Sequence, residues 1–77
     1  MSTPEMILYG KADCGLCDQA QQLLAAAGLE ARHVDVEADD ELMAQYGLRI
    51  PVLADSQGRE LDWPFDELSL ADWLHPD

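Results

Sequence analysis

Both cysteines of this chain lie in one Cys-Gly-Leu-Cys segment, residues 14–17, between an apolar run at residues 6–10 and a helical pattern. The apolar run predicts a buried strand. A helix that begins at the motif places both thiols in its first turn, where unpaired N–H groups and the helix dipole favour a thiolate over a thiol. The spacing of three residues brings the second sulfur to the same face as the first, close enough to bond to it. Such a pair is typical of a dithiol that cycles between reduced and oxidised forms.

The remaining chain predicts alternating strands and helices, with no repeat, low-complexity tract or linker. Gly28 is expected to end the first helix and Gly47 the second, because glycine is common just after helices. The expected elements are a strand at 6–10, a helix at 14–27, a strand at 31–36, a helix from 39 or 40 to 46, a strand at 51–54, a turn at 55–58, a strand at 59–61 and a helix from 66. The apolar face of the first helix is expected to comprise Leu16, Ala20, Leu23, Leu24 and Ala27.

This order, β-α-β-α-β-β-α, constrains how the strands pair. A strand–helix–strand crossover is right-handed and leaves its two strands parallel, whereas the hairpin within residues 51–61 adds two antiparallel strands. The first strand then lies inside a four-stranded mixed sheet with helices on both faces. The motif lies at the carboxyl ends of the parallel strands, where open α/β sheets carry their functional sites. We therefore expect one α/β domain over residues 1–77.

Charge and composition exclude several classes of protein. Sixteen acidic side chains against four basic ones give a net charge of -12, which repels nucleic acid and anionic membranes. This charge favours solubility or attracts a basic protein partner. Two cysteines are too few for a secreted disulfide scaffold, and residues 1–5 show no signal peptide. We expect a cytoplasmic monomer without a membrane span.

Two segments resemble glutaredoxins, which belong to the thioredoxin-fold superfamily. Residues 8–17 are similar to the first strand and active-site loop of that family, including a lysine three residues before the first cysteine. Residues 46–53, Tyr-Gly-Leu-Arg-Ile-Pro-Val-Leu, are similar to the segment that carries the family's cis-proline. Residues 49–53 and 64–67 also resemble small bacterial glutaredoxin-like proteins formerly described as a domain of unknown function. The resemblance spans nearly the whole chain and implies a thioredoxin fold.

The resemblance also implies a thiol–disulfide oxidoreductase. Cys14 would be the exposed nucleophile that attacks a disulfide, and Cys17 would resolve the mixed disulfide. Lys11 would lower the pKa of the Cys14 thiol or bind a substrate carboxylate, or it is an ordinary surface lysine. Pro51 would be cis and face the disulfide, with the backbone N–H and C=O of Ile50 pairing with an extended substrate. By spacing alone, a trans proline that opens an edge strand is the commoner arrangement.

Glutathione is the candidate thiol donor, a disulfide-containing protein or glutathione is the expected partner, and no organic cofactor or metal is required. Asp66, at a helix start, would meet the γ-glutamyl amine of glutathione. Three features argue for a more reducing pair that uses glutathione poorly, and Lys11 and Arg49 oppose them if both line the groove. Glutathione is an anion and must approach a chain with a net charge of -12. Asp13 and Asp18 flank the motif and disfavour the thiolate. Trp63 and Pro64 replace the Gly-Gly-Asp type turn that holds glutathione in glutaredoxins.

Two other classes of function fit the same dithiol. It would serve a metal or iron–sulfur carrier if a partner supplied further ligands, since His33 and His75 lack ligand spacing to the motif. Alternatively, the chain is a non-catalytic interaction protein that retains the fold. We expect His33 to be structural, His75 to be solvated and Arg49 to pair with a local acid rather than with substrate. The aromatic residues expected to close the core are Trp63, Phe65 and Trp73.

Overall fold

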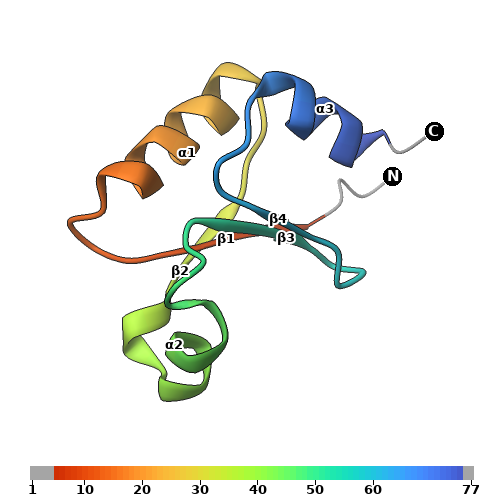
Figure 1. The fold of residues 1–77 in the computed structure, drawn as a ribbon. Helices are drawn as coiled ribbons and strands as arrows, with labels where there is room; N and C mark the ends of the chain where they lie inside the picture. The colour runs from red at the N-terminus through yellow and green to blue at the C-terminus, as the bar shows by residue number, and fades with distance from the viewer. Residues whose placement is uncertain (1–4, 76–77) are drawn as a thin grey trace.

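The computed structural model describes residues 5–75, which form a four-stranded sheet with helices on both faces (Figure 1). Residues 1–4, where the sequence predicts no signal peptide, lie outside the described residues, as do 76–77. Within the described range, no helix is long and apolar enough to cross a bilayer. The elements are β1 (Met6–Gly10), α1 (Gly15–Ala26), β2 (Arg32–Asp35), the 3-10 helix η1 (Val36–Ala38), α2 (Asp40–Tyr46), β3 (Val52–Asp55), β4 (Glu60–Asp62) and α3 (Glu67–Leu74).

The strands pair as their order along the chain predicts. The sheet order is β2-β1-β3-β4, with β1 parallel to β2 and antiparallel to β3, and with β3 antiparallel to β4. In the parallel pair, Leu8 lies beside His33 and Gly10 beside Asp35. The predicted α/β architecture, with β1 inside a mixed sheet, is therefore confirmed.

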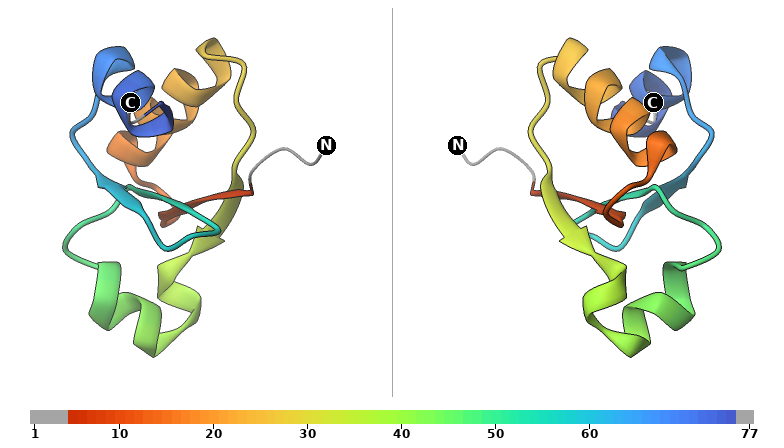
Figure 2. Two further views of the ribbon diagram at one scale, coloured as in Figure 1. Left: turned by 90° about the vertical axis from the view of Figure 1, so that its right-hand side faces the viewer. Right: turned by 90° about the vertical axis from the view of Figure 1, so that its left-hand side faces the viewer.

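Helices cover the two faces of the sheet separately. Both α1 and α3 lie on one face, whereas α2 lies on the other, as the views of Figures 1 and 2 agree. Side chains alternate along β1, so Leu8 joins the core under α1 and α3 while Tyr9 stacks on Tyr46 of α2, with ring centroids 4.1 Å apart. The larger core contains Met6, Leu8, Ala20, Leu24, Leu53, Phe65 and Leu70.

The buried face of α1 differs from the expected one in two positions. Leu16 is 47% exposed, and Ala27 is exposed as well. The buried line runs instead through Cys17, Ala20 and Leu24, and Leu16 lies one residue, about 100°, away from it. Ala27 is the C-cap, where the chain leaves the helix into Gly28 at φ 73°. The prediction of Leu16 and Ala27 as core residues was therefore wrong.

β2, β3 and β4 each differ from the predicted ranges by one residue at both ends. β2 ends at Asp35, because its carboxylate accepts the N–H of Glu37 at 2.8 Å and starts η1. β3 begins at Val52 rather than at Pro51, whose nitrogen has no hydrogen to donate to a ladder. β4 begins at Glu60 rather than at residue 59. Gly47 is the C-cap of α2, as predicted.

Candidate functional site

The two thiols lie at the start of α1 but in different surroundings. Cys14 is the N-cap, in extended conformation, and its Sγ accepts the N–H of Cys17 at 3.1 Å. Both cysteines are free thiols; Cys14 is half-buried, whereas Cys17 is only 3% exposed. A sulfur that accepts a helix N–H is in the position of a capping oxygen, where negative charge is stabilised. The geometry therefore gives one accessible thiol and one shielded thiol a turn apart.

Close packing against the end of β1 buries the second thiol. A Cβ on Gly10 would lie 2.9 Å from Cys17 Sγ, so only glycine leaves room for the sulfur. Burial, followed by the hydrogen bond to Cys14 and the charges of Cys14 and Asp18, raises the pKa of Cys17 to about 11, against a lowering by the Lys11 backbone. Cys17 is therefore held as a neutral thiol until a base or a reaction removes its proton.

The loop between β1 and the motif turns sharply. Asp13 has φ 56°, a left-handed conformation that aspartate adopts more readily than most residues with a side chain. Lys11 and Asp13 are both exposed, and Lys11 is among the residues that line a cavity beside Cys17. A hydrogen bond with the Lys11 backbone lowers the pKa of the Cys17 thiol.

A cavity of about 160 Å³ lies beside the shielded thiol. Leu8 and Gly10 of β1 and Cys17 of α1 line it together with His33 and Asp35 of β2. The parallel register explains this grouping, since Leu8 pairs with His33 and Gly10 with Asp35. The sequence prediction treated His33 as structural because no nucleophile is near it in sequence; strand register places it on a cavity shared with one.

The proline segment reaches the same edge of the sheet from the other side. The Ile50–Pro51 peptide bond is cis, and Pro51 is buried. Continuing the register of β1 with β3, in which Tyr9 pairs with Val52, sets Pro51 opposite Gly10. The Ile50 N–H already donates to the Tyr46 carbonyl at 3.0 Å. Of the two backbone groups expected to pair with a substrate, the N–H is thus engaged within the chain.

Asp66 has a structural role that the sequence predicted in part. It is the N-cap of α3, and its carboxylate accepts the N–H of Ser69 at 2.8 Å. This hydrogen bond to the Ser69 backbone lowers the pKa of Asp66, and the side chain remains exposed. The carboxylate therefore stabilises the helix start whether or not it meets a ligand.

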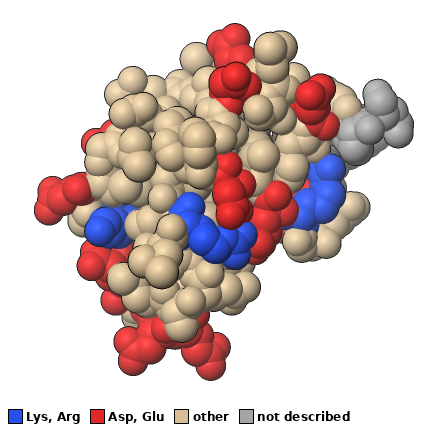
Figure 3. All heavy atoms as spheres, in the orientation of Figure 1, with Lys and Arg blue, Asp and Glu red and all other residues tan. Residues whose placement is uncertain are grey.

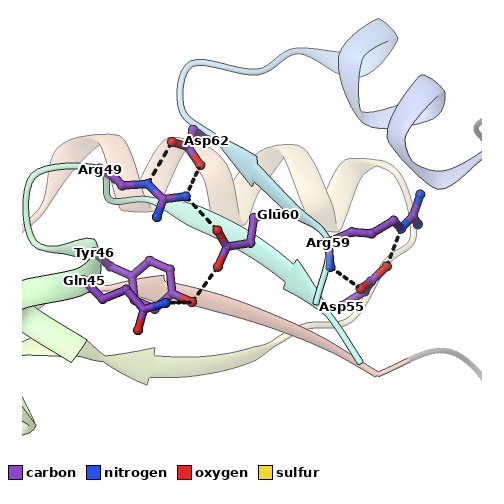
Figure 4. A network of polar contacts seen from close by, with 7 residues as sticks. All are labelled: Gln45, Tyr46, Arg49, Asp55, Arg59, Glu60 and Asp62. Carbon is purple, nitrogen blue, oxygen red and sulfur yellow. Dashed lines mark hydrogen bonds and ion pairs between the residues drawn. The ribbon is translucent and has the colours of Figure 1, made fainter. Parts of the chain in front are cut away.

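Arg49 is engaged in ion pairs, as predicted. Its Nε and Nη2 donate to the carboxylate of Asp62 at 2.9 and 2.7 Å, and Nη2 also donates to Glu60 at 2.8 Å (Figure 4). Glu60 in turn accepts the Tyr46 hydroxyl at 2.6 Å. The space-filling view shows acidic groups spread over its face, with basic groups adjoining acidic ones (Figure 3). Arg49 is thus committed to the β4 carboxylates rather than free for an anionic substrate.

The three aromatic residues expected in the core lie at its margin or within it. Phe65 is buried, and Trp63 packs edge-on against it with ring centroids 5.0 Å apart. Trp73 is half-buried and lies under the Arg59 guanidinium, 4.9 Å from the ring centroid. His75 is exposed, as expected. Within residues 5–75, no three His, Cys, Asp or Glu side chains form a group that could hold a metal ion.

Comparison with known proteins agrees with this geometry. The X-ray structure of target protein XcR50 from X. campestris is 48% identical, has a TM-score of 0.86, and is matched over 94% of this chain and 97% of that one. The solution structure of XcR50 is 47% identical, with a TM-score of 0.84 and 95% of each chain covered. Protein Ne2328 from Nitrosomonas europaea is 20% identical with a TM-score of 0.81, over 95% of this chain and 93% of that one, a likeness of fold alone.

The comparison with curated proteins gave no significant match. The family model of the glutaredoxin-like domain (DUF836), in contrast, matches residues 5–75, which hold the dithiol, the proline segment and all four strands. The chain therefore belongs to the glutaredoxin-like domain family and has its thioredoxin-like fold.

Proposed function

We propose that the protein is a thiol–disulfide oxidoreductase in which Cys14 attacks a disulfide and Cys17 resolves the mixed disulfide. The observation that carries the proposal is the unequal pair at the start of α1. Cys14 is accessible and accepts a helix N–H at its sulfur, whereas Cys17 is 3% exposed and one turn away. The accessible thiol can reach an outside disulfide, and the shielded one can reach only its neighbour.

The reaction takes place in two exchanges. The Cys14 thiolate attacks one sulfur of the substrate, the substrate S–S bond breaks, and the first substrate thiol leaves. Cys17 then loses its proton and attacks Cys14 Sγ, which releases the second thiol and forms the Cys14–Cys17 disulfide. The dithiol gives up two electrons and the substrate disulfide gains them. An external thiol must later reduce the protein again.

The charge around the site favours a disulfide-containing protein over glutathione as the partner. Glutathione is an anion, and the chain carries a net charge of -12. Arg49 is paired with two carboxylates, so Lys11 is the basic side chain that remains beside the thiols. Leu16, exposed between the cysteines, offers an apolar contact to a protein substrate. We propose glutathione as a slow thiol donor for this protein. The reaction requires no organic cofactor.

The test compares two single variants with the unmodified protein on a model protein disulfide. Cys14→Ser should abolish reduction, whereas Cys17→Ser should accumulate a mixed disulfide that mass spectrometry detects as an added substrate thiol. Trapping by Cys14→Ser but not by Cys17→Ser would reverse the assignment of the two cysteines. A pair that forms its disulfide but reduces no substrate would favour the non-catalytic interaction protein, and iron or zinc bound between two copies would favour the metal carrier.

A further inference from the structure

The second exchange poses a chemical problem at Cys17. Burial raises its pKa to about 11, so at about pH 7 only about one molecule in 10⁴ would carry the thiolate that must attack Cys14. The first exchange starts from Cys14, which caps the helix and is accessible to an outside disulfide. A nearby group that accepts the Cys17 proton would therefore act on the resolving step alone.

The cavity beside Cys17 brings such groups together. His33 and Asp35 of β2 line the same cavity as the thiol, and so does Lys11 of the loop after β1. Its volume of about 160 Å³ leaves room for a few water molecules, each of which occupies about 30 Å³ in the liquid. A proton can thus pass from the thiol to the β2 side chains directly or through water.

We propose that His33 accepts the Cys17 proton across this cavity during resolution of the mixed disulfide. This inference rests on the proposed oxidoreductase function and adds a proton acceptor to it. The Cys17 S–H proton moves to the neutral imidazole, the Cys17 sulfur bonds to Cys14 Sγ, and the substrate thiolate leaves. The imidazolium then returns the proton to that thiolate or to solvent, so atoms and electrons balance.

His33 suits this step better than its neighbour on the cavity. Imidazole has an ordinary pKa of about 6.5, close to the working pH, where general bases are most effective. One oxygen of the Asp35 carboxylate already accepts the Glu37 N–H, and a carboxylate is a weaker base. The groups that face His33 are Asp35 from its own strand, Lys11 from the loop and Cys17 from α1, while Cys14 and Asp18 act on Cys17 itself.

The two exchanges can be measured separately with an aromatic disulfide whose released thiolate absorbs visible light. The first release reports attack by Cys14, and the second reports resolution by Cys17. In the unmodified protein, the second rate should rise with pH through an inflection that reports the loss of the proton from the base. In His33→Gln this inflection should disappear, and the rate at about pH 7 should fall at least about tenfold, toward the 10²-fold typical of a lost general base.

Three controls separate proton transfer from structure. His75→Gln removes the other histidine, which is exposed at the end of α3, and should change neither rate. The first release should be the same in His33→Gln, since Cys14 does not line the cavity. Added imidazole should restore the second rate in His33→Ala, because the shortened side chain leaves space for it, whereas it should not accelerate the unmodified protein.

The outcomes distinguish this inference from the proposed function. Equal second rates and unchanged pH inflections in His33→Gln would overturn the role of His33 and leave the oxidoreductase intact. If no second release occurs in the unmodified protein, the resolving role of Cys17 fails first. Should the His33 variants not fold, the unmodified protein still decides. A second rate that is the same in light and heavy water would show that no proton moves in the rate-limiting part of that step, which would overturn the role of His33 as the base that sets this rate.

Discussion

Polar groups on the β3–β4 hairpin and polar groups around Cys17 differ in how fully they are paired. At the hairpin, Arg49 of the loop between α2 and β3 bridges Glu60 and Asp62 of β4, and Arg59 Nε donates to Asp55 at 2.7 Å (Figure 4). Arg59 also donates to the Trp73 carbonyl at 2.8 Å, which joins the hairpin to α3. These arginines use their donors to hold segments together.

Around Cys17, the side chains meet at a cavity instead of at each other. Lys11, His33 and Asp35 line it from three segments, and none of them belongs to the ion pairs found within residues 5–75. A paired charge stabilises a fold and is less available for chemistry, whereas an unpaired titratable group can exchange a proton or meet a substrate. The charged groups of the hairpin therefore stabilise the fold, whereas the groups around the Cys17 cavity remain available for chemistry.

The largest effect expected from this comparison is the difference in reactivity between the two thiols. A pKa near 11 in place of an ordinary 9.0 leaves Cys17 with an about 100-fold smaller thiolate fraction, and burial slows it further. Limiting iodoacetamide added to the reduced protein should therefore modify Cys14 first, as peptide mapping would show. Faster modification of Cys17 would contradict the burial of its thiol and the assignment of Cys14 as the accessible one.

Enlarging Gly10 should disturb the packing around Cys17 and leave the β3–β4 hairpin unchanged. Gly10→Ala puts a methyl group 2.9 Å from Cys17 Sγ, and we expect a loss of about 1–3 kcal/mol in the free energy of unfolding. Gly15→Ala is the matched control, since no atom lies within 4 Å of the added Cβ. Urea denaturation measures both variants.

The clash can be tested independently of general damage to the fold. Adding Cys17→Ala to Gly10→Ala removes the sulfur that the new methyl group meets, so the two changes should couple by about 1 kcal/mol or more. Purely additive losses would show that Gly10 is required for a reason other than the sulfur.

Asp66 belongs to both sides of this comparison. Its carboxylate is hydrogen-bonded as the N-cap of α3, and it is also the residue expected to meet glutathione. Asp66→Ala should cost about 1 kcal/mol of stability by removing the α3 cap, while Asp66→Ser should recover most of it. The serine variant keeps the cap and removes the charge. A raised KM for a glutathione mixed disulfide in this variant would place Asp66 in the substrate site, and an unchanged KM would leave it structural.

The smallest effect concerns the pH dependence of the hairpin. Hydrogen bonds from Arg49 lower the pKa values of Glu60 and Asp62 below their ordinary 4.5 and 3.8. Carboxylates with lowered pKa values in the folded state stabilise it above their ordinary values and lose that contribution as pH falls through the folded values. Because these groups are partly exposed, we expect Arg49→Gln to lower the urea midpoint only slightly near about pH 6.

Acid and salt should both remove that difference. As pH falls through the folded-state pKa values the carboxylates become protonated, so the urea midpoints of the unmodified protein and Arg49→Gln should converge. Salt at about 1 M should narrow the gap at neutral pH as well. A gap that persists in acid would show that Arg49 acts through packing on Tyr46, whose ring centroid lies 5.2 Å from the guanidinium carbon.

The sequence by itself determined the order of elements, the pairing of strands and the place of both thiols. These depend on local signals: apolar runs for strands, Gly28 and Gly47 at helix ends, and Asp66 as a cap. Connection rules then leave few topologies for a strand–helix–strand unit followed by a hairpin. Arg49 could also be assigned to an ion pair, because sixteen acidic side chains face only four basic ones in this chain.

Tertiary structure alone decided which side chains meet. The rotation of α1 over the sheet buries Cys17 and exposes Leu16, since one residue around a helix is about 100° and either placement satisfies an apolar periodicity. The register between β1 and β2 sets His33 on the cavity of Cys17, although nothing near His33 in sequence suggests it. Rotation and register are set by packing between distant segments, and so no local pattern carries them.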